Sequence, residues 1–170
     1  MRLLLPFEKA VKSGAATVMT SYNQVDGIPC TSNKRLLTDI LRGEWGFDGF
    51  VYSDLYSIEV IHSLGAACDT AQAASLALKA GLDMDLGGDA YGNNLKNELV
   101  KGAISMDDIN RAVANVLRMK FRQGLFENPY VDPKRARTTC RSTEHIAIAE
   151  QVAEEGVVLL KNDEIGRAHV

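Results

Sequence analysis

Three short apolar segments end at regular intervals along this chain, and their spacing constrains the fold more than any other feature. The segments are Ala16–Ser21, Asp48–Asp54 and Leu82–Leu86, each of which predicts a buried strand. They end near Tyr22, Asp54 and Leu86, whose numbers are 32 apart in both cases. A (β/α)8 barrel has about 31 residues per unit, so the spacing fits consecutive barrel strands. It fits a doubly wound parallel sheet equally well.

Helical patterns lie between and after these segments. Helices are predicted at about Leu4–Lys12, Ser32–Gly43, Thr70–Ala80, Asn94–Lys101, Met106–Gln123 and Thr143–Glu155. Asp69 is a candidate N-cap for the helix at Thr70–Ala80, and Gly81 can end that helix. Ser105-x-x-Asp108 forms a capping-box pattern at the start of the helix at Met106–Gln123. A proline-containing linker is predicted at Glu127–Arg141, and the apolar run Gly156–Leu160 predicts the start of another strand.

Three strands do not close a barrel, and an open parallel sheet would expose a hydrophobic strand edge. We therefore expect the chain to be a piece of something larger. The 19 basic and 22 acidic residues form no basic stripe, so nucleic acid is not expected as a partner. No apolar stretch reaches the roughly 18 residues of a membrane span, and the run at Leu3–Phe7 is broken by Glu8 too early for a signal peptide.

Metal and cofactor sites are not expected either. Cys30, Cys68 and Cys140 form no CxxC pair, and the three histidines are isolated, which excludes the common zinc patterns. The chain has no GxGxxG and no P-loop, and Gly87-Gly88 alone is too little for a phosphate loop.

Candidate catalytic residues follow the predicted strands, because active groups of α/β proteins lie at the carboxyl ends of strands. Asp54 follows a bulky apolar strand and is a candidate nucleophile, general base or metal ligand. The alternative is that Asp54 caps the turn that follows it. Tyr22 could bond Asp54 or a substrate hydroxyl, or be a half-buried loop tyrosine. Asp83 and Asp85 alternate on one strand, for which loop capping is favoured over the mouth of a barrel.

A longer pattern surrounds Asp54. The run Ile40–Ser57, ILRGEWGFDGFVYSDLYS, resembles the nucleophile signature of glycoside hydrolase family 3. The matching positions are Ile40-Leu41, Arg42, Glu44, Gly49, Phe50-Val51-Tyr52, Ser53 and Asp54, of which only Tyr52 departs slightly from the pattern. Val18–Pro29, Ala80–Gly88, Ala112–Pro133 and GVVLLKN resemble further parts of the family, so that the resemblance covers about residues 3–163.

The resemblance implies an α/β fold that is the C-terminal part of an incomplete (β/α)8 TIM-like barrel, with the first strand of a following α/β sandwich domain. Residues 1–125 would belong to the barrel, residues 126–155 to a linker and helix, and residues 156–163 to the start of the second domain. The final residues 164–170, EIGRAHV, are out of keeping with the family and resemble translated sequencing adapter, so we interpret them as a sequence artefact.

The family's enzymes are retaining exo-glycosidases, and Asp54 matches their nucleophile. The resemblance thus implies hydrolysis of terminal non-reducing β-D-glucosyl residues through a covalent glycosyl-enzyme on Asp54, with Tyr22 at the substrate. The acid/base usually comes from the second domain, and a substrate-binding Lys-His pair lies upstream. Both would be absent here, so the chain alone is expected to be inactive. Leu55 stands where the N-acetylglucosaminidase branch tends to have Asp, which favours the β-glucosidase/β-xylosidase branch.

The expected partners are a small β-glucoside or β-xyloside and the missing barrel half and C-terminal domain of the same polypeptide, without nucleic acid, membrane, metal or cofactor. The resemblance suggests a secreted or periplasmic protein, although the chain shows no signal. The alternatives are a β-xylosidase or N-acetylglucosaminidase of the same family, or a non-catalytic remnant of the fold. A phosphate-binding isomerase or aldolase would need a phosphate loop and often a strand lysine, and neither is visible.

Overall fold

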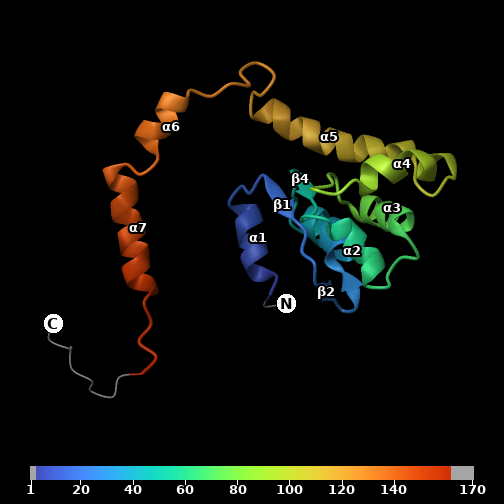
Figure 1. Ribbon diagram of the computed structural model, residues 1–170, viewed down its shortest axis with the longest axis horizontal. Helices are drawn as coiled ribbons and strands as arrows, with labels where there is room; N and C mark the ends of the chain where they lie inside the picture. Colours follow the sequence, from blue (N-terminus) through green and yellow to red (C-terminus); the bar gives the residue numbers. More distant parts are fainter. Residues whose placement is uncertain (1–2, 162–170) are drawn as a thin grey trace. The chain divides into compact units, whose positions relative to one another are not determined.

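The computed structural model describes residues 3–161 of the chain (Figure 1). The chain divides into two compact units, Met1–Asn128 and Pro129–Val170, and each is described here by itself. The first unit contains the strands and most of the helices, whereas the described part of the second unit contains two helices.

The three predicted strand segments lie side by side and run in parallel. β1 (Thr17–Met19) pairs with β4 (Phe50–Tyr52), with Val18 opposite Val51. The third segment runs along the other side of β4, where it makes a single parallel bridge between Tyr52 and Met84. The α/β class is therefore confirmed, with shorter strands than the sequence predicts.

The third predicted strand is reduced to one bridge because a side chain takes part in its pairing. The Val51 N–H donates to Asp83 Oδ2 at 2.8 Å, so a carboxylate occupies the place of a main-chain acceptor. Asp83 N and Met84 N both donate to the Val51 carbonyl, at 2.9 and 3.1 Å. Two residues therefore oppose one, as in a β-bulge, and the regular ladder does not extend over Leu82–Leu86.

Five helices of the first unit occupy predicted positions. They are α1 (Leu5–Lys12), η2 (Arg35–Glu44), α3 (Thr70–Ala80), α4 (Ala90–Val100) and α5 (Met106–Arg122). Asp69 caps α3 by accepting from Gln72 N at 2.7 Å, and Gly81 ends it with a left-handed φ of 111°. The Ser105–Asp108 capping box begins α5. η2 is wound as a π-helix, with Trp45 N donating five residues back to the Ile40 carbonyl.

Several elements of the first unit lie where the sequence predicts only loops. α2 (Ser57–Ser63) is part of the connection after Asp54, and its Ile58 and Ile61 are completely buried. β2 (Gln24–Val25) and β3 (Ile28–Pro29) form a small antiparallel hairpin, followed by the 3-10 turn η1 (Cys30–Ser32).

The core of the first unit lies between β4 and the helices around it. Its fully buried members include Val51, Ile58, Ile61, Ala73, Ala74, Ala77 and Leu82. Burial of one such large aliphatic side chain stabilises a fold by about 1.5–3 kcal/mol. The alanines of α3 let α2 and α4 pack closely on either side of it, and this packing fixes the helix that follows Asp54.

The second unit contains α6 (Pro133–Thr139) and α7 (Thr143–Gly156). α6 lies within the predicted linker, where Asp132 caps it by accepting from Lys134 N at 2.9 Å. The predicted strand at Gly156–Leu160 is not formed: Gly156 is the last residue of α7, and residues 157–161 are neither strand nor helix. A strand needs a paired neighbour, and residues 129–161 include no strand that could pair with it. The interpretation of residues 164–170 concerns a segment outside the described residues.

Candidate active site

The parallel run of β1 and β4 brings Tyr22 and Asp54 to the same edge of the sheet. Asp54 follows the last residue of β4 by two positions, and Tyr22 follows the last residue of β1 by three. The Tyr22 hydroxyl donates to the Leu55 carbonyl oxygen at 2.6 Å. Desolvation of this hydroxyl raises the pKa of Tyr22, and the nearby Asp54 carboxylate raises it further. The predicted neighbourhood of the two residues is therefore present.

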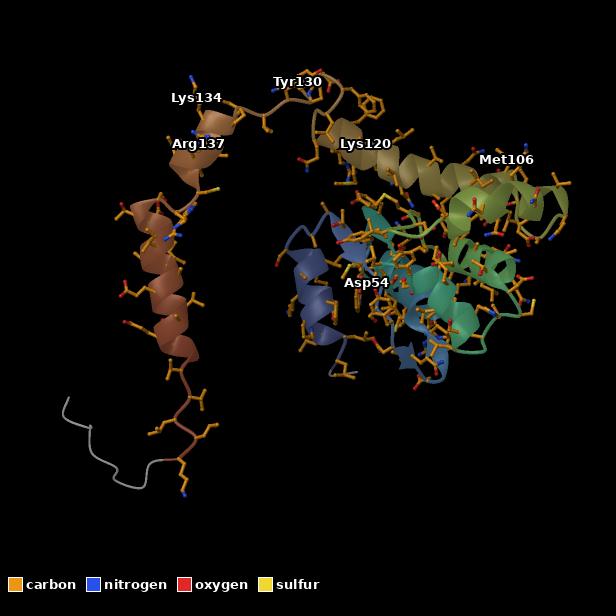
Figure 2. All side chains as sticks on the ribbon, in the orientation of Figure 1. Asp54, Met106, Lys120, Tyr130, Lys134 and Arg137 are labelled. Carbon is orange, nitrogen blue, oxygen red and sulfur yellow. The ribbon has the colours of Figure 1, made fainter. Side chains whose placement is uncertain are left out.

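Asp54 is half-buried and lies within the first unit, next to β4 (Figure 2). Its Oδ1 accepts from Leu55 N at 2.7 Å, and its carbonyl oxygen accepts from Ser57 N at 3.0 Å. α2 begins behind it without a side-chain cap. Asp54 therefore does not cap the helix that follows, and its carboxylate is fixed within its own turn.

The turn that carries Asp54 has a strained backbone. Tyr56 adopts a left-handed φ of 58°, a conformation that costs an aromatic residue about 1–3 kcal/mol. Tyr56 N donates to the Leu86 carbonyl at 3.2 Å, which ties this turn to the loop after the third segment. Gly87 in that loop has a φ of 72°, and a Cβ there would overlap the Leu55 side chain. The backbone at Gly87 therefore packs directly against the Leu55 side chain, which holds the two loops together at this edge of the sheet.

Asp83 and Asp85 lie in different environments, although their alternation on one predicted strand would place both side chains on the same face. Asp85 Oδ2 accepts from Tyr91 N at 3.1 Å in the first turn of α4, which confirms loop capping for this residue. Asp83 neither caps a loop nor lies at the sheet edge: its side chain is completely buried against Arg42. The bulge-like pairing of Asp83 and Met84 explains the difference, because it breaks the alternation on which the expectation depends.

The buried Asp83 carboxylate is the centre of a polar cluster that the sequence analysis did not predict. Arg42 Nη2 lies 2.5 Å from Asp83 Oδ2, Asn115 Nδ2 donates to Oδ1 at 2.9 Å, and Arg42 Nη1 donates to the Gly49 carbonyl at 3.0 Å. Burial raises the pKa of Asp83 and lowers the pKa of Arg42, so desolvation outweighs the attraction for both partners. The signal in the sequence that could have indicated this cluster is Arg42, the basic position of the family signature.

Ser53 and Ser57 flank Asp54 and are also buried, at 0% and 1% exposure. Each hydroxyl makes hydrogen bonds to a segment far away in the sequence. Ser53 is one of the positions that match the family signature, whereas Ser57 did not stand out, because single serines are common at helix starts.

Residues 3–161 show neither a metal site nor a membrane-spanning helix. No group of three or more His, Cys, Asp or Glu side chains in this range could hold a metal ion. His62 Nδ1 lies 3.0 Å from the Ala67 carbonyl oxygen, an ordinary structural contact. None of the helices in this range is long and apolar enough to cross a membrane.

The parallel strands, with a half-buried carboxylate and a tyrosine together at their carboxyl ends, define an α/β scaffold of the kind that carries acid–base or nucleophilic chemistry at this edge. The chain belongs to glycoside hydrolase family 3, because the sequence profile of the "Glycosyl hydrolase family 3 N terminal domain" matches its residues 2–119. This match includes Tyr22, Asp54 and the whole Ile40–Ser57 run, and it confirms the family that the sequence indicated.

Similar proteins include both β-glucosidases and β-xylosidases. The periplasmic β-glucosidase of Salmonella typhimurium is 38% identical over 92% of this chain and 21% of its own length. Beta-D-xylosidase 1 of Arabidopsis thaliana is 35% identical over 93% of the chain and 21% of its own length. The solved β-glucosidase of Listeria innocua in complex with glucose superposes with a TM-score of 0.84, at 35% identity, over 94% of this chain and 22% of that one. The chain thus spans about a fifth of the relatives it matches.

Proposed function

We propose that this chain is a segment of a retaining β-glycosidase of family 3, in which Asp54 is the nucleophile and Tyr22 a substrate-binding residue. The observation that carries the proposal is the position of Asp54: a half-buried carboxylate at the carboxyl end of β4, beside the Tyr22 hydroxyl, inside the part of the chain that matches the family. The proposal includes an arrangement of β1, β4 and the third segment as consecutive strands of a (β/α)8 barrel.

The reaction needs one bond made and one broken at the sugar. An Asp54 oxygen would attack the anomeric carbon as the bond to the leaving oxygen breaks, and a second carboxylic acid would protonate that oxygen. Water, deprotonated by the same second group, would then attack the anomeric carbon and release Asp54 as a carboxylate. In retaining enzymes the two carboxyl groups are about 5–5.5 Å apart.

Desolvation and the Asp54 charge raise the pKa of Tyr22, and its hydroxyl lies at the proposed reacting edge. We assign no acid/base residue among residues 3–161. The relatives are about five times longer than the matched segment, and we propose that the remaining barrel strands and a second α/β domain supply the acid/base and the rest of the sugar pocket.

β-Glucosides are the proposed substrates, since the Salmonella relative is a β-glucosidase and the Listeria enzyme was solved with glucose. β-Xylosides are the second candidate, because the Arabidopsis relative is a xylosidase at nearly the same identity. The two sugars differ by one hydroxymethyl group, and a pocket discriminates a group of this size by about 1–3 kcal/mol.

The first test is to extend the reading frame in the source DNA and express the full-length protein. Incubation with an activated 2-fluoro-β-glucoside should leave a stable glycosyl label on the peptide that contains Asp54, detected by mass spectrometry. Asp54→Asn should abolish the label and lower turnover at least about 100-fold. Asp39→Asn is the matched control, because Asp39 is an exposed carboxylate on η2 whose ion pair with Lys34 lies on the surface.

Three results would overturn the proposal. Label on a residue other than Asp54 removes the nucleophile assignment, and near-normal turnover of Asp54→Asn does the same. A natural frame with start and stop codons at the two ends of these residues would rule out a complete retaining site. Faster trapping by a 2-fluoro-xyloside than by the glucoside would instead change the substrate to a β-xyloside.

A further inference from the structure

We propose that two buried hydroxyl groups, those of Ser53 and Ser57, are positioning groups that hold the Asp54 carboxylate in place from both sides of its turn. The inference rests on the proposed role of Asp54 as the nucleophile and extends it to residues that do not touch the substrate. Ser53 precedes Asp54 directly, and Ser57 is the residue whose N–H closes the turn on the Asp54 carbonyl.

On one side, Ser57 belongs to a closed triangle of hydroxyls. The Thr31 hydroxyl donates to Ser57 Oγ at 3.1 Å, Thr20 Oγ1 lies 3.1 Å from Thr31 Oγ1, and Thr20 Oγ1 and Ser57 Oγ are 3.5 Å apart. The three residues are at most 4% exposed. They come from the end of β1, from η1 and from the first turn of α2, so the triangle fixes the start of α2 to the neighbouring strand.

On the other side, Ser53 binds the loop that follows the third segment. Its hydroxyl accepts from Leu86 N at 2.7 Å and lies 3.4 Å from Asp85 Oδ1. Ser53 N also donates to the Met84 carbonyl at 2.9 Å. Both the main chain and the side chain of Ser53 are therefore attached to the same neighbour, which extends the pairing of β4 beyond its last strand residue.

The Asp54 turn needs such anchors, since β4 is only three residues long and its ladder ends before Asp54. The left-handed Tyr56 in the same turn is strained, and a strained residue persists only where its surroundings hold it. A buried hydroxyl that loses its partner is unsatisfied, so each of these bonds resists displacement of the turn. The Ser53 and Ser57 anchors act on opposite ends of the turn and attach to different segments of the chain.

The test compares variants of the full-length protein by two independent measurements: the rate of covalent trapping by the 2-fluoro-β-glucoside, and the melting temperature. Ser53→Ala and Thr31→Val each remove one hydroxyl. Thr31→Ser keeps the hydroxyl and is the conservative variant. Ser75→Ala is the matched control, because the Ser75 hydroxyl is also buried and donates to Glu98 Oε2 at 3.1 Å, between α3 and α4 and outside the Asp54 turn.

We expect Ser53→Ala and Thr31→Val to slow trapping by about 10- to 100-fold at saturating 2-fluoro-β-glucoside, since displacement of a reacting group by about 1 Å costs up to 100-fold. Thr31→Ser should trap at nearly the wild-type rate. Ser75→Ala should lower the melting temperature and leave the trapping rate unchanged, as a purely structural hydroxyl would.

The inference fails if the wild-type protein is labelled on Asp54 and the two variants are labelled equally fast, whatever their melting temperatures. It also fails if Ser75→Ala slows trapping as much as they do. Absence of label on wild-type Asp54 would instead contradict the proposed function. Ser53→Ala removes a single oxygen atom from the anchor at the other end of the Asp54 turn. If the Thr31→Val protein does not fold, the trapping rate of Ser53→Ala decides the test.

Discussion

Replacement of Arg42 by methionine should be strongly destabilising, because it leaves a completely buried carboxylate without its cation. In the folded chain Arg42 lies 2.5 Å from Asp83, and their side chains are 17% and 0% exposed. Methionine is a flexible apolar side chain that can fill much of the same space without a charge. Loss of one partner from a buried pair costs about 3–5 kcal/mol, which corresponds to a decrease in melting temperature of about 6–20 °C.

The pH dependence of stability identifies the unpaired Asp83 charge as the cause of the Arg42→Met destabilisation. Burial already holds the pKa of Asp83 above its ordinary value of 3.8, and Arg42 is one of the groups that oppose this shift. Without Arg42 the folded-state pKa rises further. Between pH 3.8 and this folded pKa the folded state binds more protons than the unfolded state, so stability falls as the pH rises. The loss of unfolding free energy in Arg42→Met, relative to the wild type, should therefore be small near pH 4 and largest at neutral pH.

Urea denaturation followed by circular dichroism at pH 4 and pH 7 measures both effects. Arg35→Met is the control, since Arg35 lies exposed on the same helix, and it should change stability by less than about 0.5 kcal/mol. Adding Asp83→Asn to Arg42→Met removes the unpaired charge and should recover stability at pH 7 but not at pH 4. An equal deficit at both pH values, or a further loss from Asp83→Asn at pH 7, would refute the electrostatic explanation.

Three further predictions concern single positions. Gly49→Ala should cost about 1–3 kcal/mol in unfolding free energy, because its Cβ would overlap the main-chain oxygen of Ala16, whereas Gly43→Ala should be tolerated, since its Cβ would lie 3.6 Å from the nearest atom. Ser105→Ala removes the capping-box bond from Asp108 N to Ser105 Oγ and should lower the unfolding free energy by about 1 kcal/mol, measured by thermal denaturation. The absorbance titration that is lost in Tyr22→Phe should have a midpoint above pH 10.0, and a midpoint at or below this value would contradict the contact with Asp54.

The positions and order of β1 and β4 could be predicted from the sequence because the signals are local. Each is a short apolar segment with a clear end, and the 32-residue spacing places the ends at one edge. The caps of α3 and α5 are also local, since Asp69 and Ser105 bond to residues three positions away. For the same reason Asp54 and Tyr22 could be predicted to lie together.

Other features depend on contacts between distant residues and leave little trace in the sequence. The third strand is shortened because the Asp83 side chain accepts from Val51 N, a bond between residues 32 positions apart. α2 has seven residues and no side-chain cap, so only the burial of Ile58 and Ile61 marks it as a helix. The hydroxyl triangle joins three separate segments, and no pattern along the chain connects them.

The polar residues around β4 explain why the family pattern extends so far along the chain from Asp54. Arg42 holds the start of β4 through the Gly49 carbonyl and Asp83, and Ser53 holds its end through Leu86 N. Burial raises the pKa of Asp83 and lowers the pKa of Arg42, and a buried ion pair is weak evidence for stability, so stability alone does not account for the pair. If Asp54 is the nucleophile proposed above, fixed geometry accounts for the pair, because a three-residue strand with one full neighbour does not by itself hold a reacting group to the required precision.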